Sequence, residues 1–411
     1  MSWRETTLGE ITDLKRGFDL PKSQRLQGDV PVYSSSGITG SNSTAAVEGP
    51  CVITGRYGTI GEVFFSGGPC WPLNTALYST EFNGNNPRFV YYLLQTIPWQ
   101  GYTTASAVPG VNRNHVNLCP VKIPDRATQD AIVEVLDSIV DKIALNNRLN
   151  DYLFELVSSV FAHRFSDNVN TTELKNVLSI STKALKPQEH ADEIWEHYSI
   201  PAFDEKHRPI FEPASGIKSN KYQIDSECIL ISKLNPSTKR IWMPCCSSNN
   251  AVCSTEFIVY RPYLKEYKSF YYAAIDSPRF TDYLLEHVSG STGSRQRAQP
   301  KDTLNYLMPN PDNEEIKDFC TFADPIYRHI QINEQQTAKL ELLRETLLPK
   351  LMSGAIDVSK VDLTQLTNNH LSGCGSFCSV CCPSGLASEF HEWFREHFFF
   401  GYGHLCKADL G

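Results

Sequence analysis

The sequence contains an internal repeat with a period of about 180 residues. Apolar and asparagine positions of the segment Ile132–Leu156 recur 187 positions later, and the segment Cys51–Arg56 has a looser counterpart 177 positions later, at 228–233. The matched pairs at the offset of 187 are Ile139 and Ile326, Ile143 and Ile330, Asn146 and Asn333, Leu153 and Leu340, and Leu156 and Leu343. Such a period is far longer than the roughly 20–50 residues of a solenoid unit. The repeat therefore predicts a duplicated unit, a globular domain followed by a helix.

Length and composition bound the class of protein. A chain of 411 residues is long enough for two or three domains with cores of their own. No stretch reaches the roughly 18 uninterrupted apolar residues of a membrane span, and the N-terminus lacks a basic region followed by an apolar run. We therefore expect a cytoplasmic protein. The cysteines of the body are scattered singly, which favours reduced, packed thiols over a disulfide framework.

The net charge of -8 argues mildly against a nucleic-acid partner, because proteins that bind polyanions usually carry a basic surface. The globular parts are nearly neutral, however. Residues 1–125 contain 9 Lys+Arg and 9 Asp+Glu, and residues 166–312 contain 17 and 18. Most of the negative excess lies in the remaining segments, so either domain can carry a basic patch.

The first half of the chain predicts an α+β domain over 1–125. Short apolar runs between Ser, Gly and Asn clusters predict strands. These are Val30–Tyr33, Cys51–Thr54, Glu62–Phe65 and Ala76–Tyr78. A helix is expected near 87–95, and a long helix over 126–165, with Asp125 or Thr128 as its N-cap.

The second half predicts the same plan. Strands are expected near 227–232 and 256–260 and a helix near 267–275, within a domain over 166–312. Asp312 and Glu315 have the spacing of a capping box for a second long helix over 313–354. We expect Pro349 to end or kink that helix and Gly354 to finish it. Residues 355–411 form an atypical cysteine-rich tail.

Both long helices carry an apolar column with one asparagine at the same place. The columns are Ile132, Ile139, Asn146, Leu153 and Val160, and Phe319, Ile326, Asn333, Leu340 and Leu347. One polar position in an apolar seam sets register at some cost in stability. The favoured interpretation is an antiparallel coiled coil of the two helices, with pseudo-twofold symmetry. The alternative is two ordinary amphipathic helices, each packed on its own domain.

Five segments, in the same order along the chain, resemble the DNA specificity subunits of type I restriction–modification systems. They are Pro31–Gly40, Thr54–Gly61, Pro72–Ala76, Ile123–Gln129 and Leu342–Gly354. The resemblance covers residues 1 to about 358. It implies two tandem target-recognition domains, each recognising one half of a bipartite DNA target, held apart by the paired helices. It also implies a role in DNA methylation and in defence against foreign DNA.

Candidate DNA-binding residues lie on loops of both domains. Arginine suits guanine O6 and N7 or phosphate, and asparagine and glutamine suit adenine. The candidates are Ser35, Ser36, Arg56, Tyr57, Asn112, Arg113, Asn114, Lys233, Arg295, Gln296, Arg297 and Lys301. The alternative for each is an ordinary solvated loop. The loops at 111–115 and 293–301 occupy equivalent places before the two long helices, which favours DNA contact there.

Catalytic motifs are missing from the sequence. There is no phosphate-binding loop of the type G-x-x-x-x-G-K-[ST] and no Asn-Pro-Pro-aromatic tetrapeptide. We therefore expect a recognition subunit that is not an enzyme and binds no cofactor. The resemblance places S-adenosylmethionine on methyltransferase subunits, and ATP and magnesium on restriction subunits, as partners of this chain.

The tail offers a rival hypothesis. Thiols and histidines there could hold zinc, although an extension without a folded core is favoured. The weak metal candidates are Cys374, Cys378, Cys381 and Cys406. The rival function is a protein–protein adaptor that combines a coiled coil with a zinc-binding tail and does not recognise DNA.

Overall fold

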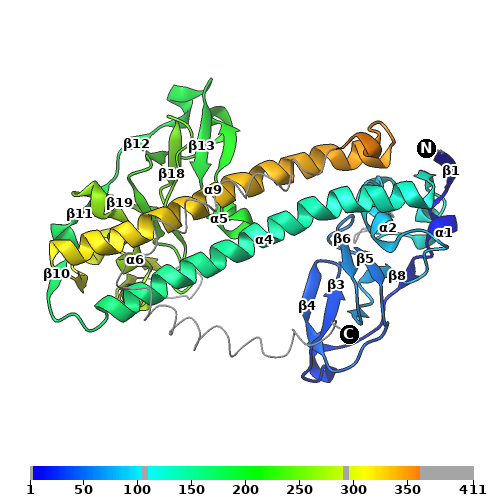
Figure 1. Ribbon diagram of the computed structural model, residues 1–411, viewed down its shortest axis with the longest axis horizontal. Coiled ribbons are helices and arrows are strands. Elements are labelled where there is room, and N and C mark those ends of the chain that lie inside the picture. The colour runs from blue at the N-terminus through cyan, green and yellow to red at the C-terminus, as the bar shows by residue number, and fades with distance from the viewer. Residues whose placement is uncertain (1–2, 104–109, 290–295, 362–411) are drawn as a thin grey trace, which may run out of the picture. The chain divides into compact units, whose positions relative to one another are not determined.

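The computed structural model describes residues 3–103, 110–289 and 296–361 (Figure 1). The chain divides into two compact units. Over the described residues, the first unit comprises 3–144 and 338–361, and the second unit comprises 145–337. Each long helix therefore contributes to both units.

The first unit contains a four-stranded antiparallel sheet, a two-stranded antiparallel sheet and a three-stranded mixed sheet. A four-stranded antiparallel sheet has the order β2-β8-β5-β6, a three-stranded sheet has the order β4-β3-β7, and β1 pairs with β9. Strand β3 pairs antiparallel with β4 and parallel with β7. The strand bounds are β1 (Trp3–Thr7), β2 (Lys15–Arg16), β3 (Val30–Ser34), β4 (Gly37–Asn42), β5 (Cys51–Gly55), β6 (Val63–Ser66), β7 (Trp71–Pro72), β8 (Ala76–Ser79) and β9 (Pro120–Pro124).

Strand β5 is the centre of the first unit because it is paired on both edges and buried along its whole length. Short helices complete this unit, α1 (Leu8–Ile11), α2 (Pro87–Leu94) and α3 (Arg113–Val116). Helix α2 begins where the Asn86 side chain accepts hydrogen bonds from the next two free N–H groups and Pro87 presets the first helical φ. Its apolar face packs on the sheet, in one core with Val52 and Leu77.

The second unit has a four-stranded antiparallel sheet of order β11-β19-β16-β17 and a five-stranded sheet of order β12-β15-β18-β13-β14. Strand β10 pairs with β22, and β20 with β21. The strand bounds are β10 (Thr171–Glu173), β11 (Leu178–Ser181), β12 (Ala184–Leu185), β13 (Ile194–Tyr198), β14 (Ile210–Pro213), β15 (Lys221–Gln223), β16 (Ile229–Ser232), β17 (Ile241–Trp242), β18 (Ala251–Ser254), β19 (Phe257–Pro262), β20 (Val288–Ser289), β21 (Arg297–Ala298) and β22 (Leu307–Pro309). The helices other than the long ones are α5 (Ile200–Lys206), α6 (Lys268–Asp276), α7 (Pro278–Glu286) and α8 (Pro300–Thr303).

The two units repeat one topology. Strands β2, β8, β5 and β6 correspond in order and direction to β11, β19, β16 and β17. The set β4-β3-β7, with one antiparallel and one parallel pairing, corresponds to β14-β13-β18. Strands β15 and β12 extend only the second of these sheets. The loose sequence repeat therefore has a counterpart in strand order.

The long helices are α4 (Arg126–Phe165) and α9 (Asn313–Met352). At 1.5 Å per residue, 40 residues extend about 60 Å. The carboxylate of Asp125 caps α4 by accepting from the N–H of Thr128 at 3.0 Å. The predicted capping box is formed at the start of α9, where the Glu315 N–H donates to Asp312 and the Asp312 N–H donates to Glu315.

Helix α9 does not end at Pro349, and that part of the expectation is wrong. The helix continues to Met352, since a proline in the last turn removes one N–H donor without preventing the final residues from remaining helical. Gly354 then ends it with a φ of +73°. A Cβ at this glycine would lie 2.8 Å from the Trp3 ring, so the close approach to β1 requires glycine as well.

Within each unit, α4 and α9 contribute to one core. In the first unit, Ile132 and Leu136 belong to the same apolar cluster as Leu351 and Met352. In the second unit, the rings of Phe161 and Phe165 lie 5.6 and 5.7 Å from that of Phe319. The N-terminal part of α4 thus shares a core with the C-terminal part of α9, and the reverse holds in the second unit.

The predicted strands and the helices near 87–95 and 267–275 are confirmed to within two residues. All cysteines of the described residues are free thiols, most of them buried. The chain is thus a mixed α/β protein with two long helices, as expected.

Candidate nucleic-acid interface

A hollow of about 880 Å³ opens on the first unit, where the loop that precedes α3 meets strands β2 and β8. Its lining brings together residues far apart in sequence. They are Lys15, Arg16, Arg56, Tyr57, Leu77, Tyr78, Gly110, Val111, Asn112, Arg113 and Asn114. Four of these side chains are cationic, and the described lining contains no carboxylate. The hollow therefore suits an anion, although the chain as a whole is acidic.

Five of the predicted DNA-binding residues meet in this hollow, namely Arg56, Tyr57, Asn112, Arg113 and Asn114. Main-chain bonds connect the two segments that carry them. The N–H of Val111 donates to the carbonyl of Arg56 at 3.0 Å, and Tyr57 forms a β-bridge with Gly110. Sequence reasoning treated these segments as separate loops, whereas the structure makes them one surface.

Glycine at position 110 is required by the ring of Tyr57. A Cβ on Gly110 would lie 2.4 Å from Tyr57 Cε1, closer than any side chain can approach. The guanidinium of Arg56 lies over the same ring, at 4.8 Å from the ring centroid. This cation–π contact holds the guanidinium of Arg56 beside the ring of Tyr57.

The segment 112–114 is stabilised by the N-cap of α3. The side chain of Asn112 accepts from the N–H of Asn114 at 3.0 Å and begins α3. Arg113 and Asn114 are exposed on the first turn of this helix. Their polar ends therefore face solvent in the hollow, together with Lys15, Arg16 and Arg56.

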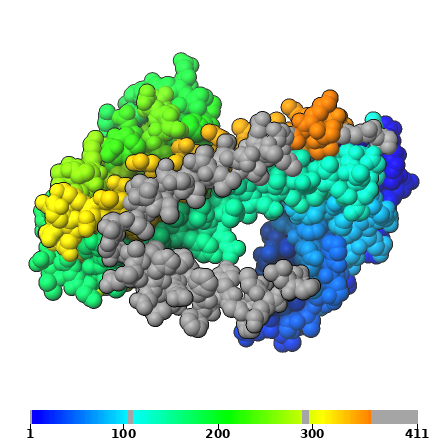
Figure 2. Space-filling view, viewed as in Figure 1, coloured from blue at the N-terminus to red at the C-terminus, as the bar shows by residue number. Residues whose placement is uncertain are grey.

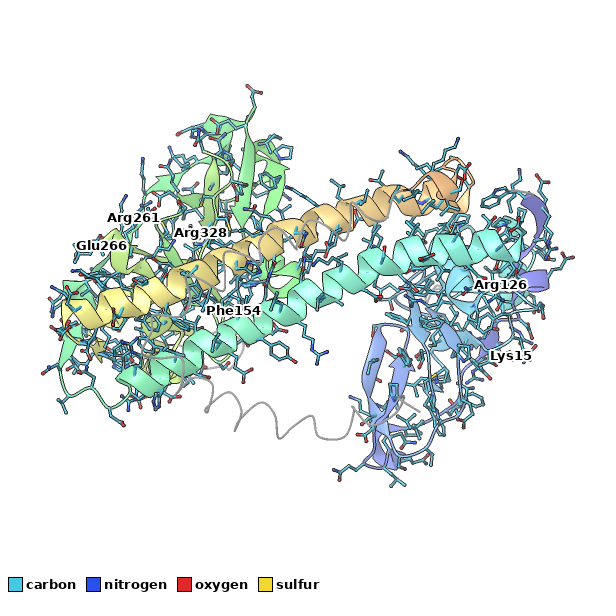
Figure 3. The ribbon with its side chains drawn as sticks, viewed as in Figure 1. Lys15, Arg126, Phe154, Arg261, Glu266 and Arg328 are labelled. Carbon is cyan, nitrogen blue, oxygen red and sulfur yellow. The ribbon has the colours of Figure 1, made fainter. Side chains whose placement is uncertain are left out.

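Lys15 and Arg16 were missed by the sequence analysis. Both lie on β2, and Figure 3 labels Lys15 on this strand. Lys15 is 2.5 Å from Glu81, and Arg16 is 3.6 Å from Asp19. The hydrogen bond to Glu81 raises the pKa of Lys15, so its ammonium stays charged. The adjacent basic pair before Gly17 was the signal available in the sequence.

Ser35 and Ser36 lie on the turn between β3 and β4, outside the lining of the hollow. The Ser36 N–H donates to the Ser34 hydroxyl at 3.2 Å, and the carbonyl of Ser35 accepts from the Thr59 hydroxyl. This second bond connects the serine turn to the turn that carries Arg56 and Tyr57. Ser36 is exposed.

The second unit repeats the backbone frame of the hollow. The Ala298 N–H donates to the Lys233 carbonyl at 2.9 Å, as Val111 does to Arg56. The Lys233 N–H donates to the Glu256 carbonyl at 2.9 Å, and the Arg56 N–H donates to the Thr75 carbonyl at 3.0 Å. By this frame, Lys233 corresponds to Arg56.

Three further candidates lie around this second frame. The Gln296 carbonyl accepts from the Asn235 N–H at 2.9 Å, and Arg297 bridges to Leu234. Lys301 is exposed on α8, where its counterpart in the first unit is Asn114. Arg297 corresponds to Gly110 rather than to Arg113, so the two loops are equivalent in backbone but not arginine for arginine. Arg295 lies outside the described residues.

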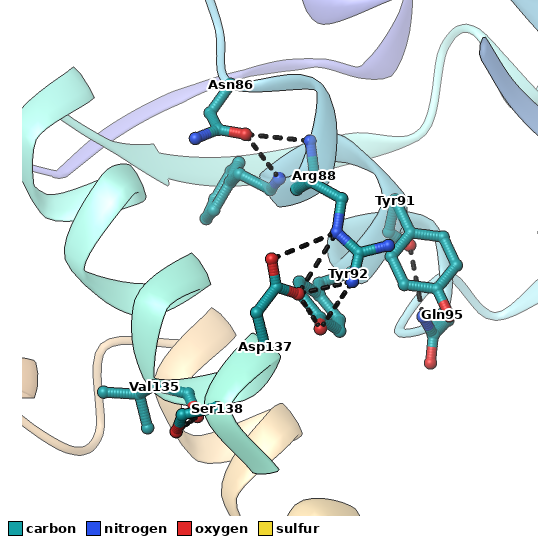
Figure 4. Close-up of polar contacts among 9 residues, drawn as sticks. Asn86, Arg88, Tyr91, Tyr92, Gln95, Val135, Asp137 and Ser138 are labelled. Carbon is teal, nitrogen blue, oxygen red and sulfur yellow. Dashed lines mark hydrogen bonds and ion pairs between the residues drawn. The ribbon is translucent and has the colours of Figure 1, made fainter. Parts of the chain in front are cut away.

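The first unit is tied to α4 by Arg88 of α2 (Figure 4). Its guanidinium forms an ion pair with Asp137 and also lies over the rings of Phe65, Tyr91 and Tyr92, at 4.7, 4.9 and 5.4 Å from their centroids. Burial together with the hydrogen bond to Asp137 raises the pKa of the Tyr92 hydroxyl above its usual range. In Figure 2 the strands of this unit and the start of α4 form one continuous surface.

The described residues contain no cluster of three or more His, Cys, Asp or Glu side chains able to hold a metal ion. Cys374, Cys378, Cys381 and Cys406 lie outside them, so the structure does not bear on the proposed zinc site. Over the same ranges, no helix has the length and apolar character needed to span a bilayer.

Comparison with solved structures shows the fold. The S subunit of a type I restriction-modification system from M. genitalium superimposes with a TM-score of 0.58 at 15% identity, over 86% of this chain and 96% of that one. The HsdS subunit from Thermoanaerobacter tengcongensis is aligned over 86% and 97% with a TM-score of 0.31 at 16% identity. A comparison with curated proteins gives no match.

Residues 1–153 match the family model of the type I restriction modification DNA specificity domain. These residues include the whole hollow and the first part of α4. Residues 1–153 are thus similar to a type I restriction modification DNA specificity domain, and the chain has the fold of the M. genitalium S subunit.

Proposed function

We propose that this chain is the non-catalytic subunit that recognises a bipartite DNA target. Residues 1–125 would recognise one half-site and residues 166–312 the other, as tandem target-recognition domains. The spacer helices, over 126–165 and 313–354, would pair as an antiparallel coiled coil and set the gap. The atypical tail, over 355–411, has no part in this proposal.

The cationic hollow of the first unit is the observation that carries the proposal. Four cations without a carboxylate in the described lining suit the phosphates of DNA, and the exposed ends of Arg113 and Asn114 suit base edges. The repeat of the same main-chain bonds around Lys233 supports a second site of the same kind. This argument favours DNA recognition over the rival adaptor function.

The partners follow from the proposed role. Methyltransferase subunits would bring S-adenosylmethionine, and restriction subunits would bring ATP and magnesium, while this chain binds double-stranded DNA and no cofactor. We expect the complex to work in the cytoplasm.

The proposal is tested by selecting double-stranded DNA from a random-sequence pool with the full chain, co-purified with its methyltransferase subunits. We expect a selected site of two short half-sites separated by unspecified bases. Binding to single-base variants at two salt concentrations then assigns residues. Losing a base contact should cost roughly 1–3 kcal/mol at one position, whereas losing a phosphate contact should weaken all sequences and reduce the salt slope by about one.

Residues that contact bases and residues that contact phosphates should give different results in this assay. Arg113→Ala should alter only one half-site and Arg297→Ala or Arg295→Ala only the other. Lys15→Ala and Arg16→Ala should weaken all sequences alike. Lys317→Ala is the matched control, because this exposed cation pairs with Glu314 on α9 and belongs to neither frame. A pool that yields no enriched sequence would reject DNA recognition.

A further inference from the structure

The turn that follows β16 contains a residue in a left-handed backbone conformation. Asn235 has a φ of +49°, a region that residues other than glycine enter at a steric cost. The repeated frame places it at the position of Gly58, whose φ is +77°. Each is the second residue after the cation of its frame, Arg56 or Lys233. The first unit thus uses glycine where the second unit uses asparagine, although glycine is the less strained choice.

Two ion pairs anchor this turn to neighbouring helices of the second unit. The Lys239 ammonium lies 2.6 Å from the Asp276 carboxylate of α6. The Arg240 guanidinium donates two hydrogen bonds, of 2.6 and 2.9 Å, to the Asp204 carboxylate of α5. The charges that follow Asn235 are therefore used within the unit, and they fix the turn before DNA arrives.

The side-chain oxygen of Asn235 has no such partner among the described residues. Its Oδ1 is closed to solvent and accepts no hydrogen bond, which is unfavourable for a buried polar atom. Rotation of the side chain towards a ligand that supplies a donor would break no hydrogen bond of this oxygen and would satisfy it. The main chain of the same residue lies beside a candidate DNA-binding loop, because its N–H donates to the Gln296 carbonyl at 2.9 Å.

An asparagine amide matches the hydrogen-bonding pattern of adenine. In the major groove adenine presents the N6 amino group as a donor and N7 as an acceptor, and Oδ1 and Nδ2 of one amide can pair with both. We propose that Asn235 recognises an adenine in the half-site of the second unit. This inference rests on the proposed function, since it requires DNA at this surface. The first unit lacks the contact, because Gly58 has no side chain.

The test uses the full chain with its methyltransferase subunits and the site selected from random double-stranded DNA. Asn235→Gly removes the amide and gives the turn the residue that the first unit has. It should reduce discrimination at one adenine by about 5- to 150-fold, the equivalent of roughly 1–3 kcal/mol for a bidentate contact. The other base pairs of both half-sites should be discriminated as by the parent. Competition binding with single-base variants of the site measures each ratio.

Further variants separate the amide from the backbone. Asn235→Asp keeps a short side chain that tolerates the left-handed conformation but has no N–H donor for N7, so it should also lose the adenine preference. Gly58→Asn is the matched control in the first unit, where an added Cβ would meet only the Ser35 hydroxyl, at 3.9 Å. It should leave discrimination in the second half-site unchanged. The thermal midpoint of Asn235→Gly should stay within about 5 °C of the parent, because glycine adopts a positive φ readily.

Three outcomes overturn the inference while leaving the proposed function intact. They are unchanged discrimination in Asn235→Gly, a loss confined to a base pair other than A·T, and an equal loss of affinity for every sequence, which would indicate a phosphate contact. A parent complex that selects no sequence would instead overturn the proposed function.

Discussion

Asn333 of α9 donates a hydrogen bond from Nδ2 to Oδ1 of Asn150 in α4, at 2.8 Å and closed to solvent. Asn146 donates in the other direction, to Gln336 at 2.8 Å and to Thr337 at 3.4 Å. Asn150 follows Asn146 by four positions, and Thr337 follows Asn333 by four. These contacts form two polar layers, Asn333 with Asn150 and Asn146 with Thr337. The two layers are equivalent when α4 and α9 are exchanged, because each pairs a column asparagine with the residue four positions after the other asparagine. Each asparagine of the apolar columns thus donates a hydrogen bond to the other helix.

We expect the Asn333 layer to behave as a pair. Asn333→Leu should lower the free energy of unfolding by about 1–3 kcal/mol, because the buried Oδ1 of Asn150 loses its donor. Asn150→Leu combined with Asn333→Leu should recover most of that loss, since two apolar groups satisfy each other. Urea unfolding of the single and double variants measures the cycle. Additive losses would show that the hydrogen bond contributes nothing beyond packing.

The two layers also bear on register, which stays a prediction for Asn146 and Asn333. Replacing only these two by leucine removes the donors to Asn150 Oδ1 and to the Thr337 hydroxyl, so we expect loss of stability from that variant. Replacing all four should stabilise helix association and loosen its alignment. A change in the DNA spacing preferred by the fourfold variant would support the register role, and unchanged spacing would contradict it.

Arg88 should be the most sensitive surface position of the first unit. Arg88→Ala removes the ion pair to Asp137 and the contacts with three rings, and leaves a carboxylate whose side chain is only 27% exposed. We expect a loss of about 2–4 kcal/mol in thermal or urea unfolding. Lys122→Ala, which breaks the exposed pair with Glu5, should change stability by less than about 0.5 kcal/mol. Similar losses from both would contradict the anchoring role of Arg88.

The stability of the second unit should fall as pH rises towards 8. Burial raises the pKa of Glu334 to about 8, from an ordinary value of 4.5. The folded state then binds more protons than the unfolded state between these values, so its stability decreases as pH rises through them, by at most about 1.4 kcal/mol per pH unit. Burial lowers the pKa of the neighbouring His207, whose opposite slope is confined to pH below its ordinary value of 6.5.

Urea unfolding of the parent and of Glu334→Gln between pH 6.5 and 8 therefore reports on Glu334. Glu334→Gln should remove the slope in this window and be the more stable protein at pH 8. An unchanged slope would show that Glu334 is ionised in the folded state.

The spacer hypothesis predicts a change in the DNA gap. Seven residues inserted between Ala144 and Leu145, and seven between Thr337 and Ala338, preserve the cores of both units while lengthening both helices by about 10 Å. The preferred gap between half-sites should widen by about three base pairs, without change in the half-sites. Selection from a random DNA pool measures the gap. Inserting the heptad in α4 alone is the control, because it shifts the apolar column of α4 relative to that of α9. An unaltered gap in the double insertion would contradict the hypothesis that the two helices set the gap.

The spacing of apolar residues and the helix N-caps made most helices and strands predictable from the sequence. The long helices followed from matched apolar columns and from Asp125 and Asp312, because caps and seams are local signals. Strand pairing was not local. The parallel pairing of β3 with β7 joins segments separated by β4, β5 and β6, and no sequence pattern specified it.

The candidate site was predicted in part for the same reason. Arg56 and Asn112 were recognised by residue type, but their meeting depends on the Val111 bond to Arg56 and on a glycine beneath Tyr57. Lys15 and Arg16 enter the hollow because β2 pairs with β8, which sequence alone did not indicate. The loops at 111–115 and 293–301 were expected to be equivalent, and only the backbone frame assigned Arg297 to the place of Gly110.

The frame around Arg56 and Lys233 is made by main-chain N–H and C=O groups, and it is the same with Thr75 or Glu256 and with Val111 or Ala298 in place. Its geometry is therefore independent of most side chains that it presents to solvent. Substitutions at such positions leave the core intact. They therefore affect ligand binding much more than they affect folding. A duplicated domain built this way can diverge in what each copy binds while both copies keep one architecture.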